Sequence, residues 1–368
     1  MAGEQGTEMR RAYPRTVVRG YGLVPIGIAS VVLALAVVTV FRPWSERNIE
    51  ARVRANGGGV SVGALEPWNP RRAADYLAAR RAHVTWLRGD LSWRWLEPRR
   101  GEWDWSLYDP VVADARRAGL HYLAILHTVP GWANGDAGDY APPTDTALLG
   151  DYCYRTARHY LPLGVTDYEI GNEVNLPHPG WPDASGARYA ERVLLPCAAG
   201  VRRAAAESGT VANVMLGALA PTGATGGADP AGFLTDVYRH GGRGRFDSVS
   251  WHPYTGAAHP AVSRQMNTEP DRLHAVMAAH GDGGKKVWAT EFGRPTAGPD
   301  STSERAQAAL VDQALDAWYA KAYAGPLLWY SLRDLGTSET DREEHFGLLR
   351  HDGTPKPALA AVGARLRR

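Results

Sequence analysis

The feature of this sequence that most restricts its fold is a regular alternation of short apolar runs with amphipathic helical patterns between residues 60 and 368. Strands that alternate with helices in this way form parallel sheets, and eight such units fit a (β/α)8 TIM barrel. A doubly wound sheet is the alternative, but no glycine-rich phosphate turn follows the first expected strand. The expected strands are Val60–Leu65, Val84–Arg88, Tyr122–His127, Asp167–Gly171, Val214–Leu219, Ser248–Trp251, Lys286–Thr290 and Leu327–Tyr330.

Long polar or Gly/Pro-rich segments follow several of these strands, for example residues 128–145 and 333–345. Barrel enzymes carry their chemistry at the carboxyl ends of the strands, so we expect a site there. The helical patterns cover Ala73–Arg81, Pro110–Ala118, Leu148–Tyr160, Ala187–Ser208 and Ser303–Ala324, with a closing helix from Pro357.

The segment before the barrel contains 22 uncharged residues, 20–41, which is long enough to cross a bilayer as one helix. A cleaved signal peptide is the alternative, but its apolar region would be shorter and would end in a small-residue cleavage site. We therefore expect a short arm (1–19), a transmembrane anchor (20–41), a linker (42–59) and the barrel domain (60–368). Arginines flank the span on both sides. We expect a single-pass cell-membrane protein with its barrel outside the cytoplasm.

The amino-acid composition restricts the classes of partner that this protein is expected to bind. The net charge is only +2, which gives no electrostatic support to a nucleic-acid partner. The chain has 13 Trp and 16 Tyr but 5 Phe, and rings with a polar edge commonly line sugar sites as well as cores. Cys153 and Cys197 are the two cysteines; they form one disulfide outside the cytoplasm or two buried thiols inside it, and we favour the disulfide.

Two glutamates follow expected strands at positions that suit catalysis. Glu173 comes two residues after the fourth strand, in "DYEIGNEVN", and Glu291 comes directly after the seventh, in "KKVWATEFGRP". Glycoside hydrolysis needs one protonated carboxylic acid and one ionised carboxylate on either side of the scissile bond. For a single glutamate, a loop cap or a salt bridge is an equal alternative, whereas the pair favours catalysis. Glu169, inside the fourth strand, is expected to be structural.

Further polar and aromatic residues occur at other strand ends. Arg88 ends the second strand, where it can hold a carboxylate ionised, and His127 ends the third. His252 and Tyr254 follow the sixth strand, and Trp329 lies on the eighth. The first strand carries no His-x-His pair, and the chain has no HExxH motif or cysteine cluster, so we expect neither a metal nor a cofactor.

In these motifs the sequence resembles the clan A glycoside hydrolases, which are retaining (β/α)8 enzymes, and most of all families 39 and 5. The resemblance covers most of residues 60–368 and rests on "NE" at 172–173, "TEFG" at 290–293, "WRWLEPRRGEWDWSLYDPVV" and "HFGLLRHDGTPKPAL". It implies that Glu173 is the acid/base and Glu291 the nucleophile, and that Asn172 binds the substrate's 2-hydroxyl.

The resemblance also implies supporting roles around a sugar. Arg88, His127, His252 and Tyr254 fall where such enzymes carry supporting residues, and burial and nearby negative charge are expected to raise the pKa of Glu173. Trp329 is expected to form a stacking floor. Two further tryptophans lie in loops, where local packing is the alternative role: Trp132 and Trp181.

The predicted protein is a membrane-anchored retaining glycosidase that cleaves an oligo- or polysaccharide of the cell envelope or extracellular space. A transglycosylase with the same residues and a non-catalytic glycan-binding barrel are the alternatives. The sequence makes no prediction of the sugar or of the oligomeric state.

Overall fold

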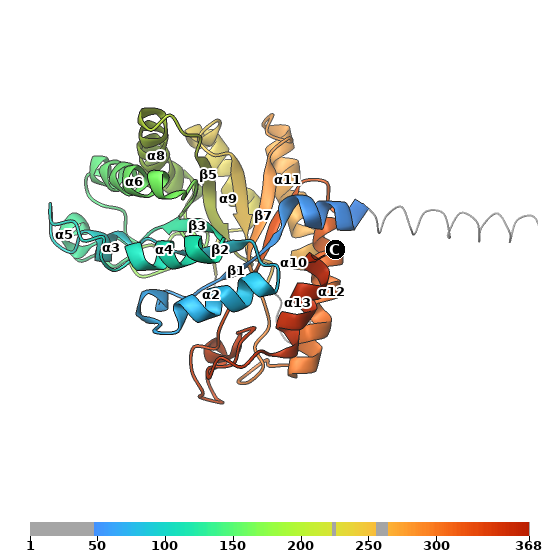
Figure 1. Cartoon of the computed structure of the whole chain (residues 1–368). Coiled ribbons are helices and arrows are strands. Elements are labelled where there is room, and N and C mark those ends of the chain that lie inside the picture. The colour runs from blue at the N-terminus through green and yellow to red at the C-terminus, as the bar shows by residue number, and fades with distance from the viewer. Residues whose placement is uncertain (1–47, 223–225, 255–263, 368) are drawn as a thin grey trace, which may run out of the picture. The chain divides into compact units, whose positions relative to one another are not determined.

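The computed structural model of the chain describes residues 48–222, 226–254 and 264–367 (Figure 1). Within these ranges no helix is both long and apolar enough to cross a membrane. The arm and transmembrane helix expected at residues 1–41 lie outside the described residues. Residues Arg47–Arg368 form one compact unit.

Eight parallel strands close into a barrel in chain order, as the sequence predicted, because β8 pairs with β1. The register runs Val60–Leu87–Tyr122 across the first three strands. The strands are β1 Gly58–Ser61, β2 Trp86–Asp90, β3 His121–Leu126, β4 Asp167–Ile170, β5 Asn213–Leu219, β6 Ser248–Trp251, β7 Lys286–Phe292 and β8 Ala324–Tyr330.

Helices cover the outside of the barrel (Figure 1). The side chains of Asp145 and Ser303 cap the amino ends of α6 and α12, and Gly119, with a left-handed backbone, ends α4. The α-helices are α2 Arg72–Arg81, α3 Trp93–Leu96, α4 Asp109–Ala118, α5 Gly131–Asn134, α6 Thr146–Tyr160, α7 Gly186–Tyr189, α8 Leu195–Glu207, α9 Pro230–Val237, α10 Arg264–Asn267, α11 Glu269–Ala279, α12 Glu304–Tyr319 and α13 Pro357–Leu366. Shorter turns are η1 Glu66–Trp68, η2 Leu161–Leu163, η3 Ala190–Leu194, η4 Tyr238–Gly242 and η5 Arg342–His345.

One predicted helix is interrupted. The sequence suggested a continuous helix over Ala187–Ser208, but the structure has α7, a π-helical segment (η3) and then α8. Pro196 explains the break, because proline has no N–H to donate to the preceding turn and its ring clashes there. The helix therefore contains a wider, π-helical turn before α8 begins.

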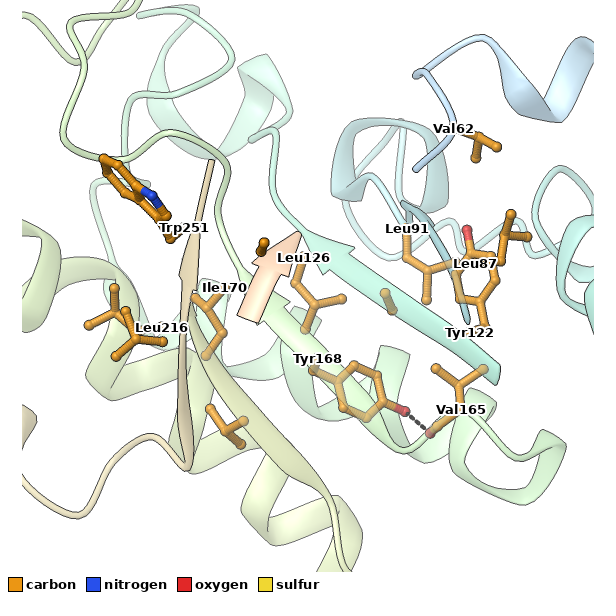
Figure 2. Packing of buried hydrophobic residues seen from close by; sticks show 14 of the residues in the cluster. Val62, Leu87, Leu91, Tyr122, Leu126, Val165, Tyr168, Ile170, Leu216 and Trp251 are labelled. Carbon is orange, nitrogen blue, oxygen red and sulfur yellow. Dashed lines mark hydrogen bonds between the residues drawn. The ribbon is translucent and has the colours of Figure 1, made fainter. Parts of the chain in front are cut away.

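Alternate strand residues point inward and outward. The outward row includes Leu126, Ile170 and Leu216 on neighbouring strands, which pack beneath the helices (Figure 2). Inside the barrel, an apolar layer of five residues is centred on Trp86 and Trp288, whose rings meet edge to face at 4.9 Å. The other three members of this layer are Leu123, Met215 and Leu328.

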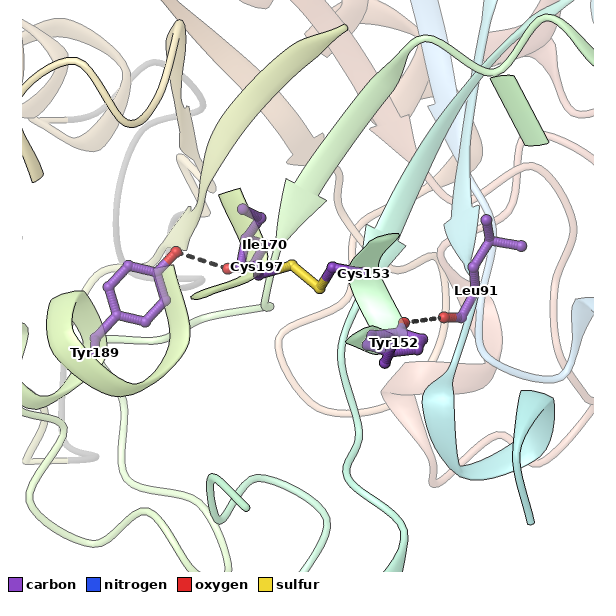
Figure 3. Close-up of a disulfide and its surroundings, with 6 residues drawn as sticks. All are labelled: Leu91, Tyr152, Cys153, Ile170, Tyr189 and Cys197. Atoms are coloured by element: carbon purple, nitrogen blue, oxygen red, sulfur yellow. Dashed lines mark hydrogen bonds between the residues drawn. A yellow bond between two sulfur atoms is a disulfide. The ribbon is translucent and has the colours of Figure 1, made fainter. Parts of the chain in front are cut away.

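Cys153 and Cys197 form a disulfide between α6 and α8. Its neighbours fasten the helices to strand ends (Figure 3). The Tyr152 hydroxyl donates to the carbonyl of Leu91, 2.5 Å away, and the Tyr189 hydroxyl donates to the carbonyl of Ile170, 2.7 Å away. Cys197 lines a cavity together with Ile170 and Gly171, so the disulfide lies behind the end of β4, the strand that leads to Glu173.

Part of the segment expected to be a linker is helical: residues 48–56 form a helix ahead of β1. Val53 on this helix is buried, and Nη1 of Arg52 donates to the carbonyls of Tyr319 and Ala320, both 2.9 Å away. These carbonyls precede β8, so the helix lies at the amino ends of the strands.

Candidate active site

A pocket of about 600 Å³ opens at the carboxyl ends of the strands. Its lining comes from the ends of β1–β4 and β6–β8 and from the segments that follow them. Six of the residues expected to act on substrate line this pocket: Arg88, His127, Asn172, Glu173, Tyr254 and Glu291.

Arg88 organises the base of the pocket. It projects from β2 into the barrel interior with 1% of its side chain exposed. Its Nε donates to Glu169 and its Nη1 to Glu291, each at 2.5 Å, while Nη2 donates to Oδ1 of Asn172 at 2.7 Å. Burial lowers the pKa of Arg88, but the two carboxylates outweigh burial and keep this pKa above its usual value. Arg88 therefore stays charged between a structural glutamate below and Glu291 above.

Glu291 is held from two sides. Oε1 accepts from Arg88, and Oε2 accepts from the hydroxyl of Tyr254 at 2.9 Å. Burial and the nearby charge of Glu291 hold the pKa of Tyr254 well above its usual value, so this hydroxyl keeps its proton and remains a donor. The cation and the hydroxyl together fix the orientation of this carboxylate in the pocket.

Glu173 follows β4 in a tight turn. Gly171 has a φ of +93°, and a Cβ at this position would lie 2.6 Å from Val174, so the turn requires glycine. Glu173 itself has a φ of +50°, which is unusual for a residue with a side chain. The backbone carbonyl of Glu173 lies 3.1 Å from Nε2 of His178. Backbone strain of this kind recurs at functional sites.

His252 joins the two glutamates. Its side chain is fully buried, and Nδ1 lies 3.1 Å from Oε1 of Glu173 and 3.7 Å from Oε2 of Glu291. Burial raises the pKa of Glu173, but the hydrogen bond and charge of His252 outweigh burial and hold this pKa below its usual value. The raised pKa expected from the sequence is therefore wrong in this structure, because that expectation did not count His252 as a partner.

A second set of polar residues forms another wall of the pocket. Nε2 of His127 is 3.1 Å from Oδ1 of Asp90. Burial raises the pKa of Asp90, but His127 and Arg88 outweigh it and keep this pKa below its usual value. Tyr140 stacks on His178 with ring centroids 4.0 Å apart, and burial raises the pKa of Tyr140 to about 12. Asp90, His127 and Tyr140 thus supply polar atoms to one wall.

None of the three tryptophans expected at the site lines this pocket, and the stacking floor expected at Trp329 is wrong. Trp329 is buried and packs edge to face against Phe292, because side chains alternate along β8 and this one points outward. Trp132 packs against Trp93 and donates its Nε1 hydrogen to the carbonyl of Glu97. Trp181 is buried, with its Nε1 donating to the carbonyl of Val174.

Tyr330, one residue after Trp329, is the aromatic residue that β8 presents to the pocket. Its register with Ser61, which accepts a hydrogen bond from Arg88, would have identified it as an inward position. Sequence reasoning also missed Asp90, Tyr140, Arg342 and Glu343. Asp90 carried a usable signal, because it lies two residues beyond Arg88 and so on the same face of β2.

Among the residues that the structure describes, no group of three or more His, Cys, Asp or Glu side chains could hold a metal ion. One glutamate is fixed by a cation and a hydroxyl, and a second shares a hydrogen bond with a histidine. Two carboxyl groups so placed at the mouth of a (β/α)8 barrel have the chemical capacity for acid and nucleophile roles.

Comparisons with known proteins point to the same class. A family model for glycoside hydrolase family 42, described as beta-galactosidase, matches residues 66–136. No curated protein matches the chain. The resemblance to clan A glycoside hydrolases predicted from the sequence is confirmed by this model together with solved structures from families 39, 5 and 10.

Three solved structures illustrate the similarity. A family 39 glycoside hydrolase from Bacteroides cellulosilyticus WH2 has a TM-score of 0.66 and 22% identity over 87% of this chain and 65% of its own. An exo-beta-1,4-mannosidase from Opitutaceae bacterium strain TAV5 has a TM-score of 0.60 and 18% identity over 85% and 59% of the two chains. Xylanase 10B from Thermotoga maritima has a TM-score of 0.60 and 14% identity over 87% and 97%. The chain thus spans less than two thirds of the length of the first two proteins. At identities this low, the structural similarity establishes the fold alone.

Proposed function

We propose that this protein is a retaining glycoside hydrolase with Glu173 as acid/base and Glu291 as nucleophile. The observation that carries the proposal is the shared contact with His252. Because the two carboxylate oxygens lie 3.1 and 3.7 Å from one nitrogen, they are no more than about 7 Å apart. Retaining enzymes have carboxyl groups about 5–5.5 Å apart, whereas inverting enzymes need about 6.5–9.5 Å to admit a water.

The first step uses the difference between the two carboxyl groups. Glu291, held in place by Arg88 and Tyr254, attacks the anomeric carbon, and the protonated form of Glu173 gives its proton to the departing glycosidic oxygen. The product is a glycosyl ester of Glu291 and a free alcohol. In the second step Glu173, now ionised, takes a proton from water, and the resulting attack on the anomeric carbon releases Glu291 with net retention.

Asn172 is placed to contribute to substrate binding. Its Oδ1 accepts from Arg88, so its amide NH₂ is oriented for a sugar hydroxyl beside Glu291. Asp90, His127 and Tyr140 offer further polar atoms on the facing wall. A pocket of about 600 Å³ is in the usual range for small-ligand sites, which supports a sugar as substrate.

The substrate class in this proposal is an oligo- or polysaccharide of the cell envelope or extracellular space. The named activities of the similar structures, a mannosidase and a xylanase, concern glycans. The apolar run at residues 20–41 supports a membrane anchor, and the disulfide supports an oxidising compartment for the barrel. A reporter fused to the carboxyl end is expected to be active only outside the cytoplasm; activity inside it would reverse the proposed topology.

The test is a screen of the wild-type protein against aryl glycosides and purified envelope glycans. Glu173→Gln is expected to lower turnover about 10²–10⁴-fold, and Glu291→Gln to abolish it. Glu102→Gln, which changes an exposed carboxylate that does not line the pocket, is the control. Azide is expected to rescue Glu291→Gly with inverted product stereochemistry. Turnover that survives the loss of Glu291 would exclude this mechanism.

The same experiment separates the alternatives. Transfer of the sugar to an added acceptor in preference to water would identify a transglycosylase, since both acceptors compete for one glycosyl-enzyme. Binding of a glycan without any turnover would identify a non-catalytic barrel.

A further inference from the structure

A second pocket, of about 300 Å³, lies beside the candidate active site. It is formed by residues 62–70, which follow β1, together with residues 331–335 after β8 and His351. Val62 and Gly63 line both pockets, so the two adjoin along the β1–β8 side of the barrel mouth. Gly63 has no side chain to separate the two pockets. The atoms nearest to a Cβ built at Gly63 are those of the Leu335 side chain, at 3.6 Å.

The wall of this second pocket exposes large apolar groups. Trp68 is 51% exposed and Leu65 is 64% exposed, and Leu335 on the opposite side is 39% exposed. The ring of Trp95, itself 45% exposed, meets Trp68 edge to face at 5.6 Å and extends the aromatic surface. Neighbouring tryptophan rings exposed to water are energetically unfavourable, and exposed apolar patches of this kind usually mark a binding site.

The polar groups of the pocket indicate which ligand fits. Arg333 is already bound to Asp75, and Asp334 to Lys356, so neither pair is available to hold a charged ligand. Glu66 differs, because burial raises the pKa of Glu66 to about 7. Its nearest amide donor, Asn69 Nδ2, is 3.4 Å from both carboxyl oxygens, at the long limit of a hydrogen bond. An indole face beside a poorly solvated carboxyl group matches a neutral sugar, which has an apolar ring face and hydroxyl donors.

The place of this pocket around the barrel indicates which part of a glycan reaches it. The acid/base protonates the leaving oxygen, so the leaving group lies on the β4 side, where Glu173 is. In an eight-stranded barrel ordered β1 to β8, β8 lies opposite β4 and next to β7, which carries Glu291. Sugars at the β1–β8 side therefore belong to the part of the substrate that becomes attached to Glu291.

We propose that the pocket around Trp68 and Glu66 is a binding subsite for a second neutral sugar on the non-reducing side of the cleaved bond. This inference rests on the proposed glycosidase function and goes further, because it sets the cleavage mode. A protein with this subsite binds two sugars on the glycone side of the cleaved bond, so it releases disaccharides in preference to single sugars.

The test uses the full chain and reducing-end-labelled oligosaccharides of two to six β-1,4-linked mannose, galactose, xylose or glucose units. For whichever series is cleaved, wild-type kcat/KM is expected to rise from the disaccharide to the tetrasaccharide, and the longer chains are expected to give mainly glycone products of two or more sugars. Trp68→Ala is expected to lower kcat/KM on the longer chains about tenfold and to flatten this rise, and Trp68→Tyr to restore most of it. Glu66→Gln keeps a hydrogen-bonding group and is expected to cost less than Glu66→Ala.

Leu77→Ala is the matched control, because Leu77 is 46% exposed on α2 and lines neither pocket. It is expected to leave the dependence on chain length unchanged. Release of mainly single sugars from the longer chains, or a Trp68→Ala variant with the wild-type dependence on chain length, would overturn the subsite while leaving the glycosidase intact. A wild-type protein that cleaves no glycoside in any of these series, nor any in the wider screen, would instead overturn the proposed function and the subsite with it.

Discussion

At the scale of single residues, the barrel mouth depends on one cation that two carboxylates share. Glu169 has no exposed side-chain surface and Arg88 only 1%, so neither charge is compensated by water. Thr290 adds a hydrogen bond to Glu169 at 3.2 Å. The same guanidinium that satisfies this buried carboxylate also fixes Glu291 and orients Asn172. Stability and the geometry of the site are therefore linked through Arg88.

Replacing Arg88 tests this link. Arg88→Met leaves Glu169 buried without its cation and is expected to lower the free energy of unfolding by about 3–5 kcal/mol in urea titrations. Adding Glu169→Gln is expected to recover a large part of the loss. Arg94→Met, which breaks an ion pair whose partners are 51% and 45% exposed, is the control and is expected to cost less than about 1 kcal/mol. An Arg88→Met protein as stable as the control would contradict the role of Arg88.

His252 is expected to set the pH range of activity. Its hydrogen bond and charge hold the pKa of Glu173 below its usual value, so Glu173 loses its proton at a lower pH than it otherwise would. His252→Asn is expected to raise that pKa and so move the alkaline limb of the kcat/KM profile to higher pH. Profiles of both proteins between pH 4 and 9 give the comparison. An alkaline limb that stays in place or moves to lower pH would show that His252 does not control Glu173.

Sequence reasoning located the catalytic candidates well, because a glutamate just beyond an apolar strand must lie at a strand end. It failed where a shift of one residue along a strand decides whether a side chain points into or out of the barrel. Trp329 and Tyr330 are both aromatic and adjacent, and only the pairing of β8 with β1 shows that Tyr330 points inward. Contacts made across the barrel, such as that of His252 with Glu173, depend on tertiary geometry and left no local pattern to read.

At the scale of elements, all eight strands were predicted, because alternating apolar strands and amphipathic helices have few other solutions. The boundaries of some elements differ from those expected. β1 is Gly58–Ser61 in place of Val60–Leu65, and the expected helix to Ala324 ends at Tyr319 because Ala324 already belongs to β8. Short helices such as α3 and α5 were missed, since four residues carry no periodicity.

The disulfide between α6 and α8 is expected to stabilise the half of the barrel that carries Glu173. It closes a loop with a sequence separation of 44, for which cross-linking the unfolded chain contributes about 2–4 kcal/mol. The double variant Cys153→Ala, Cys197→Ala is expected to unfold at correspondingly lower urea. Reductant is expected to destabilise the wild-type protein and to have no effect on this variant. Equal stability of the two proteins under oxidising conditions would contradict the prediction.

At the scale of the whole molecule, the two ends of the barrel have different tasks. The carboxyl ends of the strands carry both pockets, and the amino ends carry the helix 48–56 through which the chain enters the barrel. Helices α13 and α12 meet the start of the first strand: a Cβ at Gly58 would lie 2.8 Å from Leu366, and the Tyr319 hydroxyl donates to the carbonyl of Gly57 at 2.6 Å. Helix 48–56 binds the end of α12 through Arg52. These contacts lie where β1 and β8 close the barrel.

Helix 48–56 is therefore expected to stabilise closure without affecting chemistry. A chain starting at Gly57 loses the buried Val53 and the two hydrogen bonds of Arg52, and we expect it to be about 3 kcal/mol less stable than a chain starting at Arg47. In the longer chain, Val53→Ala should reproduce part of the loss, whereas Ala55→Ser on the exposed face should not. Urea titrations measure stability, and turnover per folded molecule should be equal in all four proteins. A shorter chain that is stable but has lost turnover would contradict this prediction. It would show that a helix at the amino ends of the strands affects the pocket at their carboxyl ends.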